Sequence, residues 1–293
     1  MRRLLAASLA ALLAGCGPNT PGTDTAPSAA ANVPEPAAAP ASEPVSPLQA
    51  AIAGEWRDPA NVARDQWRHP QQTLEFFGIQ PNMRVVEITP GGGWYTEILA
   101  PWLAPQGQLV AALIDPASSS SERARSYYSE SNQKLRDKLA AQPQQYRKVE
   151  LVEFSLTTPS FGTPASADAV LTFRNVHNWI NAGAAPGMFK GFFEVLKPGG
   201  VLGVVEHRAN SDVPEGDRSG YMSEQQVIAL ATAAGFVLDE KSEINANLAD
   251  TKDHPNGVWS LPPGNRHDEA DAAKYQAIGE SDRMTLRFRK PAG

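Results

Sequence analysis

The chain has 293 residues, of which 42% are apolar, 20% are charged and 8% are aromatic, and its formal net charge at pH 7 is −6. This composition can fill a sizeable core, which excludes a wholly disordered chain and a fibrous repeat. An acidic chain also lacks the basic stripe that binds a phosphate backbone, so we expect no nucleic-acid partner.

The first 15 residues have the pattern of a secretory signal peptide. Arg2 and Arg3 precede an apolar run from Leu4 to Leu13, which is too short to span a bilayer. The letters LAGC at the end of this run resemble the lipobox of bacterial lipoproteins, whose cysteine is lipidated and becomes the new N-terminus. The resemblance implies that Cys16 carries lipid and that the chain is an exported, membrane-anchored lipoprotein facing the periplasm. A buried or idle thiol is the alternative for this cysteine, which is the only one in the chain.

Residues 16–48 have a composition that is typical of a disordered linker. From residue 17 to residue 48, eight prolines stand among Ala, Ser, Thr and Gly, with few side chains large enough to build a core. We therefore expect a lipidated tether over residues 16–48, which attaches the protein to a membrane through its lipid alone. The folded domain is then expected over residues 49–293.

Residues 49–293 alternate between apolar strand-like runs and helical patterns, which is typical of an α/β fold. We predict one doubly wound, mostly parallel seven-stranded sheet with helices on both faces, in a Rossmann-like arrangement. The predicted strands cover residues 84–88, 108–114, 148–154, 169–173 and 201–206, a run that begins at 236, and residues 284–289. The predicted helices cover residues 61–77, 95–103, 121–141, 188–196 and 223–235, the last from the capping-box pattern of Ser223 and Gln226.

A glycine-rich turn follows the first predicted strand, with the sequence EITPGGGWY from Glu87. In a doubly wound sheet, ligands bind beyond the carboxyl ends of the strands, and glycine lets backbone N–H groups approach them closely. The turn does not fit the dinucleotide pattern G-x-G-x-x-G, because Thr96 stands where the last glycine is needed. It therefore predicts a site for another small ligand, with a turn needed only for packing as the alternative.

The turn resembles motif I of the class I S-adenosylmethionine-dependent methyltransferases, in which an acidic residue precedes a glycine-rich loop. The stretches DAVLTFRNVHNW and LKPGGVLGVVEHR resemble the fourth-strand and fifth-strand regions of that family. Together with NANLADTKDHPNGVWSLPP and the terminal DRMTLRFRKP, they resemble one group of bacterial predicted methyltransferases over residues 56–291. The resemblance implies a methyltransferase that uses S-adenosylmethionine as cofactor and acts on a small-molecule acceptor.

Matching positions imply the residues of the cofactor site. Glu87 is expected to hold the amino end of the cofactor, directly or through water. Gly91, Gly92 and Gly93 are expected to line its methionine portion, in a turn that Pro90 fixes.

Two positions depart from the family pattern. Thr89 stands where motif I usually has a glycine, and Leu113 stands where an acidic residue usually binds the ribose hydroxyls. Asp115, two residues further along, is our candidate for the ribose, and an aspartate that only caps a turn is the alternative.

Polar and aromatic groups crowd the end of the fourth predicted strand, where an apolar core has no use for them. We expect Arg174 and Asn175 to contact the cofactor and His177 to act as the base. Methyl transfer needs alignment of the reactants and, for some nucleophiles, removal of a proton. Glu206 and His207, at the end of the fifth predicted strand, are second catalytic candidates, with a structural ion pair involving Arg208 as the alternative.

Three features border the predicted site. Tyr95 directly follows the turn and would shape the methyl pocket or cap the helix. Arg64, Arg68 and His69, on the helix predicted over residues 61–77, could face the pocket, but a solvated face is the expectation. Residues 245–263 form a long insertion between the last two strands, and loops of this length are often lids.

We expect no metal cofactor. The loop residues Asp250, Asp253 and His254 lack a paired ligand set for a hard cation. The trio His69, His177 and His207 lacks the short spacing that is typical of zinc ligands.

The predicted export leaves a second function open. S-adenosylmethionine is made from ATP in the cytosol, where an exported lipoprotein would not meet it. The alternative is a catalytically inactive periplasmic binding protein that keeps the methyltransferase fold and takes another small ligand in the same cleft. Leu113 favours this alternative, whereas the intact PGGG turn and the FRNVHNW cluster favour the enzyme.

Overall fold

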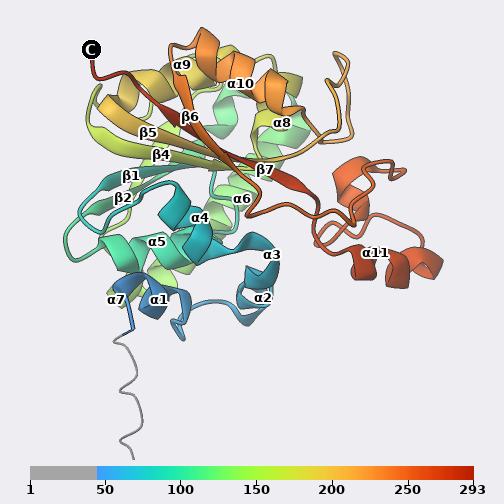
Figure 1. Ribbon diagram of the computed structural model, residues 1–293. Helices are drawn as coiled ribbons and strands as arrows, with labels where there is room; N and C mark the ends of the chain where they lie inside the picture. Colours follow the sequence, from blue (N-terminus) through green and yellow to red (C-terminus); the bar gives the residue numbers. More distant parts are fainter. Residues whose placement is uncertain (1–44) are drawn as a thin grey trace, which may run out of the picture. The chain divides into compact units, whose positions relative to one another are not determined.

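Seven strands form a single sheet in the computed structural model, which describes residues 45–293. Their order is β3-β2-β1-β4-β5-β7-β6; the first five strands of the chain are parallel, and β7 is antiparallel to both of its neighbours. The predicted fold class is confirmed, since the sheet is mostly parallel and helices cover both of its faces (Figure 1). The strands are β1 (Arg84–Ile88), β2 (Gln108–Ile114), β3 (Glu150–Phe154), β4 (Ala167–Phe173), β5 (Leu196–His207), β6 (Val237–Ser242) and β7 (Arg283–Arg289).

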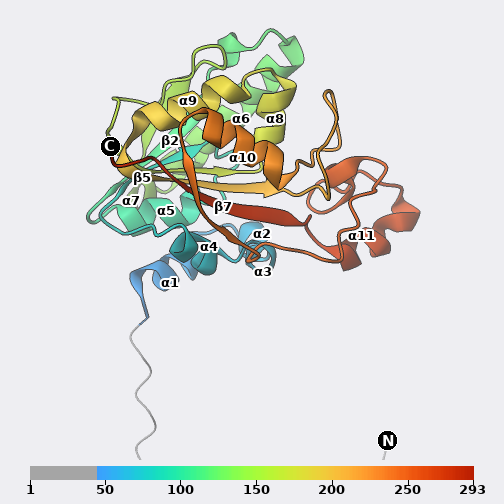
Figure 2. The ribbon, with the colours of Figure 1, turned by 45° about the horizontal axis from the view of Figure 1, so that its top comes forward.

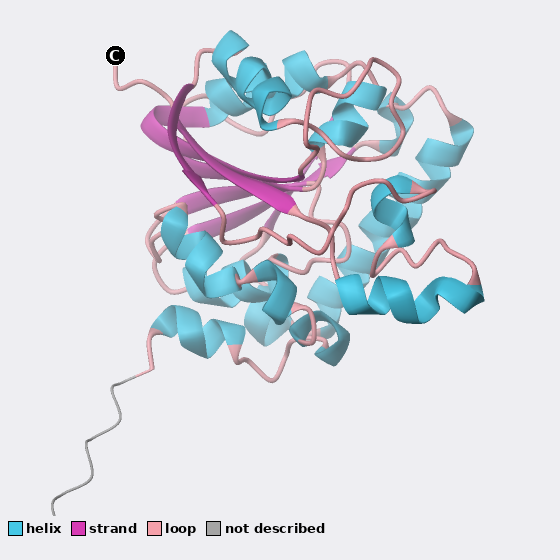
Figure 3. Cartoon of the chain, turned by 45° about the vertical axis from the view of Figure 1, so that its right-hand side comes forward, coloured by secondary structure: helices cyan, strands magenta, loops and turns pink. Residues whose placement is uncertain are grey.

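The sheet lies between two layers of helices, as Figure 3 shows. One apolar core joins Val86 to α8, α9 and α10, and a second core on the other face joins Val85 to α1, α4, α5 and α7. Consecutive strand residues point to opposite faces, so a strand in the middle of the sheet needs apolar residues at every position. The helices are α1 (Pro47–Ile52), α2 (Pro59–Val62), α3 (Asp65–Arg68), α4 (Pro70–Phe76), α5 (Thr96–Leu103), α6 (Glu122–Ala141), α7 (Pro143–Tyr146), α8 (Val176–Asn181), α9 (Ala185–Val195), α10 (Glu224–Ala233) and α11 (Ala272–Ile278), with 3-10 turns η1 (Pro116–Ser118), η2 (Gly257–Ser260) and η3 (Glu269–Asp271).

The folded domain begins slightly earlier than predicted. α1 starts at Pro47, after a capping box in which the side chains of Ser46 and Gln49 each accept a hydrogen bond from the other residue's backbone N–H. Leu48 is buried in the second core. The first helix therefore includes Pro47 and Leu48, the last two residues of the predicted tether. The predicted signal peptide and Cys16 lie outside the described residues.

The single helix predicted over residues 61–77 is also wrong, because α2, α3 and α4 replace it. The chain breaks between His69 and Pro70. His69 adopts the left-handed conformation with a φ of 40°, and Pro70 has no N–H to donate to a preceding turn. The break leaves Arg68 buried, where an unbroken amphipathic helix was expected to present it to solvent.

The segment between β6 and β7 includes α11 and lies beyond the end of the sheet at which β7 begins (Figure 2). His207 and Arg283 are partners in the antiparallel register of β5 and β7. The residues just before β7 therefore lie at the carboxyl end of β5. Among the helices within residues 45–293, none is both long enough and apolar enough to cross a bilayer.

Gly203 in β5 provides a test of the packing between the sheet and α4. A Cβ atom at this position would lie 2.7 Å from Leu171 Cδ2 and 2.8 Å from Phe77 Cδ2, and both of these side chains are fully buried. We expect Gly203→Ala to lower the free energy of unfolding by about 1–3 kcal/mol in urea denaturation. Gly92→Ala is the matched control, because nothing lies within 4 Å of its added Cβ. An equal loss of stability in the two variants would contradict this packing.

Candidate active site

A cavity of about 660 Å³ opens at the carboxyl ends of the parallel strands. Ile88, Ile114, Phe173 and His207 line it from the ends of β1, β2, β4 and β5. The strand order reverses between β1 and β4, and doubly wound sheets bind ligands at such a reversal. The volume falls within the range of about 300–1,000 Å³ that is typical of small-molecule sites.

The glycine-rich turn forms one wall of this cavity. Pro90, Gly91 and Gly92 line it, and a Cβ added to either glycine would enter open space. Gly91 also needs to be glycine because its φ is 58°. Gly93 does not line the cavity; a Cβ there would lie 2.9 Å from Leu135 Cδ1, so this glycine lets α6 pack closely.

The backbone conformation at Thr89 is one that favours glycine, the residue that motif I usually has at this position. Its φ of 51° is a left-handed conformation that a β-branched residue rarely adopts. Its Oγ1 is buried and has no hydrogen-bond partner among residues 45–293, although the residue lines the cavity. Buried hydroxyls are nearly always paired, so this unpaired atom adds to the cost of placing a threonine here.

Glu87 is buried at the end of β1 and also lines the cavity. Thr96 Oγ1 donates a hydrogen bond of 2.6 Å to Glu87 Oε2. Burial raises the pKa of this carboxyl group from 4.5 to about 7, and repulsion from the Glu97 carboxylate adds to the effect. A cation in the cavity would favour the ionised form of Glu87.

The end of β2 carries no acidic group that faces the cavity. Leu113 is buried in the core, and Asp115 caps η1 by accepting a hydrogen bond of 2.9 Å from the Ala117 N–H. Asp115 does not line the cavity, so the structure does not bring this predicted ribose ligand to the site. Tyr127 and Tyr128 of α6 also line the cavity, although no motif in the sequence predicts this.

Arg174 and Asn175 follow β4 and line the cavity. The amide of Asn175 donates a hydrogen bond of 3.1 Å to the Ile88 carbonyl and so joins the ends of β4 and β1. Arg174 has a φ of 62°, and its N–H donates a bond of 2.7 Å to the Val205 carbonyl. Strained residues of this kind are concentrated at functional sites.

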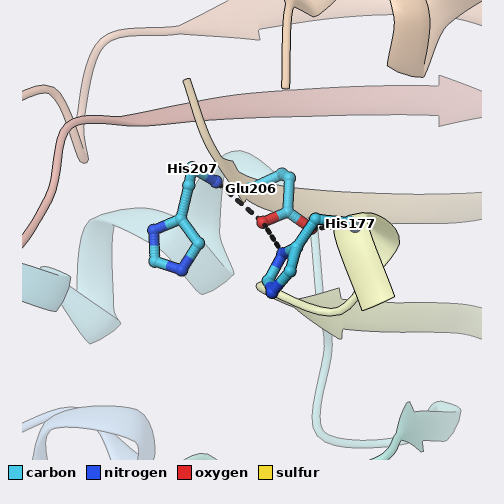
Figure 4. A group of neighbouring side chains, drawn as sticks. All are labelled: His177, Glu206 and His207. Atoms are coloured by element: carbon cyan, nitrogen blue, oxygen red, sulfur yellow. Dashed lines mark hydrogen bonds and ion pairs between the residues drawn. The ribbon is translucent and has the colours of Figure 1, made fainter. Parts of the chain in front are cut away.

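His177 and Glu206 form a buried hydrogen-bonded pair (Figure 4). His177 Nδ1 lies 3.0 Å from Glu206 Oε1, and Glu206 Oε2 accepts a bond of 2.6 Å from the Val176 N–H. His177 lines the cavity and keeps its second ring nitrogen free of this pair. A carboxylate bound to one imidazole nitrogen fixes the tautomer and leaves the other nitrogen able to accept a proton.

The alternative reading of Glu206 as a partner of Arg208 is wrong. The guanidinium of Arg208 binds both carboxylate oxygens of Asp282 at 3.0 Å and also reaches Glu224 and Glu243. Glu206 is therefore left to orient His177.

Of the three histidines that the sequence analysis rejects as a zinc trio, His177 and His207 line the cavity and His69 does not. The structure instead gathers His177, Glu206 and His207, with possible ligand atoms within 4.8 Å of one another. Glu206 Oε1 already accepts a hydrogen bond of 2.8 Å from the His207 N–H. Burial, His177 and the nearby arginines hold the pKa of His207 well below its usual value, and the same positive field opposes a metal cation.

Tyr95 forms part of the cavity wall. Its ring stacks on Phe173 with centroids 3.6 Å apart, and its hydroxyl donates a long bond of 3.4 Å to the Arg68 carbonyl. Burial raises the pKa of Tyr95 to about 12, so the phenol is neutral at physiological pH. Its position suits a role in shaping the pocket.

Arg64 and Arg68 line the cavity, so the expectation of a solvated face for them is wrong. Arg68 is 2% exposed, its guanidinium lies over the Trp94 ring, and it pairs with Glu280 at 3.2 Å. Glu280 and Ser281 also line the cavity, although neither was predicted as a site residue. The only signal for them was the charged run ESDR just before the last strand.

The segment predicted as a lid forms another wall. Val258, Trp259 and Pro262 line the cavity from residues 245–263. Asp250 and His254 of the same segment face each other instead, with His254 Nε2 at 2.9 Å from Asp250 Oδ1. Their contact fixes the loop internally.

Comparisons with known proteins identify the fold. A scan of protein-family models finds no match, and a search of curated proteins also finds none. The crystal structure of a SAM dependent methyltransferase from Aquifex aeolicus is 14% identical and aligns over 84% of this chain and 98% of its own, with a TM-score of 0.52. The crystal structure of the cyclase SpnF is 17% identical and aligns over 85% of this chain and 94% of its own, with a TM-score of 0.51. At such identities the likeness shows that this chain has the class I methyltransferase fold, whereas the reaction must be argued from the site.

Glu87 provides a test of the burial at the end of β1. Because its folded pKa of about 7 exceeds 4.5, the folded state holds a proton that the unfolded state releases between these pH values. The stabilisation from Glu87 is thus complete below about pH 4.5 and is lost as the pH rises through 7. We expect the free energy of unfolding of the wild type, relative to Glu87→Gln, to fall by about 3 kcal/mol from pH 4.5 to pH 8. Urea denaturation at several pH values measures this difference, and a pH-independent difference would contradict the buried position.

Proposed function

We propose that this protein is an S-adenosylmethionine-dependent methyltransferase that acts on a small acceptor. The observation that carries the proposal is the cavity at the reversal between β1 and β4, which has two open glycine positions on one side and a buried carboxyl group at its base. The class I methyltransferase fold supports it, because neighbouring structures of that fold include an S-adenosylmethionine-dependent enzyme.

The residues of the cavity fit the cofactor at its methionine end. Gly91 and Gly92 leave room for the amino-acid portion of the cofactor. Glu87 would hold the cofactor's ammonium group, which favours the ionised carboxylate. When bound, the cofactor supplies a methyl group on a positively charged sulfur.

The adenosine portion of the cofactor would contact residues at the end of β2 and on α6. No acidic side chain at the end of β2 lines the described cavity, but Ile114, Tyr127 and Tyr128 do. We propose that the two tyrosines contact the adenosine in place of the usual carboxylate, since aromatic rings stack on nucleobases and phenols form hydrogen bonds.

His177 would remove a proton from the acceptor where the nucleophile carries one. The Glu206 carboxylate at 3.0 Å from Nδ1 fixes the ring and stabilises the imidazolium that forms. Tyr95 and Phe173 supply an apolar wall, and the segment 245–263 would act as a lid through Val258 and Trp259. The proposed chemistry therefore consists of alignment, exclusion of water and one proton transfer.

A second candidate is a periplasmic ligand-binding protein without catalytic activity. Two observations favour it: the leucine at the ribose position, and the placement of Asp115 outside the cavity. The fold alone does not decide between the two functions. The cyclase SpnF has a similar fold, which illustrates that this fold is not confined to proteins named as methyltransferases.

Calorimetry with S-adenosylmethionine and S-adenosylhomocysteine tests the proposed function. We expect the full chain to bind both compounds, and we expect Gly92→Val to weaken binding at least tenfold because its side chain would fill the cavity. Gly187→Ala is the control, because its added Cβ would make only ordinary contact with Pro159, at 3.4 Å, outside the cavity. Melting temperatures would show whether each variant is folded. A wild-type chain that binds neither compound at millimolar concentration would remove the enzyme proposal.

We also propose that the domain is exported and attached to a membrane by lipid on Cys16. The expected product is a mature chain whose N-terminal residue is Cys16, with the added mass of acyl chains in mass spectrometry. Cys16→Ser would abolish both the processing and the added mass. A wild-type chain that retains Met1 would contradict the proposed localisation.

A further inference from the structure

Four arginines surround one carboxylate at the end of the cavity next to β5 and β7. Glu280 forms ion pairs with Arg64 Nε at 2.6 Å, with Arg68 Nε at 3.2 Å and with Arg283 Nη1 at 3.0 Å. Arg174 lies close enough to influence the titration of both Arg68 and Glu280. We refer to Arg64, Arg68, Arg174 and Arg283 as the arginine cluster.

The arginine cluster carries more positive charge than the protein neutralises. Burial opposes ionisation of Glu280, but Arg68 and Arg283 lower its pKa to about 2, so it contributes one negative charge. Four guanidinium groups and one carboxylate leave a formal excess of three positive charges. Of the described residues that line the cavity, the only other acid is Glu87, which is hydrogen-bonded to Thr96.

Arg174 is the member of the cluster that lacks a partner. Within residues 45–293, its guanidinium makes no hydrogen bond or ion pair, whereas those of Arg64, Arg68 and Arg283 all bind Glu280. Burial lowers the pKa of Arg174 to about 10, so the group is still charged at neutral pH. An unpaired charge in a partly buried site is costly, and an anion bound there would offset the cost.

The backbone holds Arg174 between the end of β4 and α8, which carries His177. The φ of 62° is a strained conformation for a residue other than glycine, and the bond from its N–H to the Val205 carbonyl maintains it. The residue follows Phe173, which stacks on Tyr95, and precedes the proposed base His177 by three positions. An anion bound to Arg174 would therefore lie near the groups that would align the acceptor.

We propose that the acceptor carries a carboxylate or phosphate group, and that Arg174 binds this group. The proposal rests on the proposed function, in which the cofactor would occupy part of the same cavity. The cofactor contributes one carboxylate, which offsets at most one of the three excess charges. Guanidinium groups bind both carboxylates and phosphates through paired hydrogen bonds, so the chemistry of Arg174 suits either anion.

Anion titrations test this proposal. Sodium phosphate and sodium acetate are titrated separately into the full chain saturated with S-adenosylhomocysteine, at constant ionic strength, with tryptophan fluorescence as readout because Trp94 and Trp259 line the cavity. We expect saturable binding of at least one anion, weakened at least tenfold in Arg174→Gln and partly retained in Arg174→Lys. Arg147→Gln, at an exposed arginine with no ion pair among the described residues, is the matched control and should bind like the wild type.

The variants also distinguish the acceptor's anion from the cofactor's carboxylate. The affinity for S-adenosylhomocysteine should change less than twofold in Arg174→Gln if the guanidinium serves the acceptor. An equal loss of affinity for S-adenosylhomocysteine and for the anion would assign Arg174 to the cofactor and overturn the proposal. Absence of anion binding in the wild type would overturn it as well.

Failure of the proposed function gives a different result. In that case S-adenosylhomocysteine would not bind, and the same anions titrated into the ligand-free chain would still report on Arg174. Loss of this binding in Arg174→Gln but not in Arg147→Gln would then support an anion site without a methyltransferase.

Discussion

The arrangement of the site depends on the reversal of strand order between β1 and β4. From β1 the chain adds β2 and β3 on one side, and it then crosses to add β4 and β5 on the other. Loops that leave β1 and β4 must therefore diverge, which opens a space at the carboxyl edge of the sheet. The hydrogen bond from the Asn175 amide to the Ile88 carbonyl keeps the two strand ends together at the base of this space.

Charges of opposite sign are placed at different parts of that space. The buried Glu87 lies beside α5 at the end of β1, and the arginine cluster gathers where β5 and β7 meet. Each charge is only partly compensated by the protein, because Glu87 has a raised pKa and Arg174 has no partner among the described residues. A cavity of this kind favours a ligand pair with a cationic group near Glu87 and an anionic group near Arg174.

Local patterns predicted most of the fold. β1 and β2 begin and end where the apolar runs do. A strand that is buried on both faces needs apolar side chains at consecutive positions, so its limits are visible in the sequence. The capping box of Ser223 and Gln226 was predictable because it is local. Both of its hydrogen bonds connect residues three positions apart. The glycine-rich turn was recognisable because its chemistry is confined to a few consecutive residues.

The errors arose where distant residues decide the outcome. Arg68 appeared to belong to a solvated helix face, but its partner Glu280 is 212 positions further along the chain. Asp115 was a reasonable ribose ligand by position, yet its side chain is used by the turn of η1. The arginine cluster was not predicted, because its members come from α3, the loop before it, and the ends of β4 and β7. Such groups meet only through the tertiary fold.

A crystal structure of the chain with S-adenosylhomocysteine would test the central claim most directly. We expect the ligand in the cavity at the β1–β4 reversal, with its methionine atoms against Gly91 and Gly92, its ammonium group near Glu87, and Arg174 free of its carboxylate. A ligand found elsewhere, or a cavity from which the compound is absent at saturating concentration, would contradict the account.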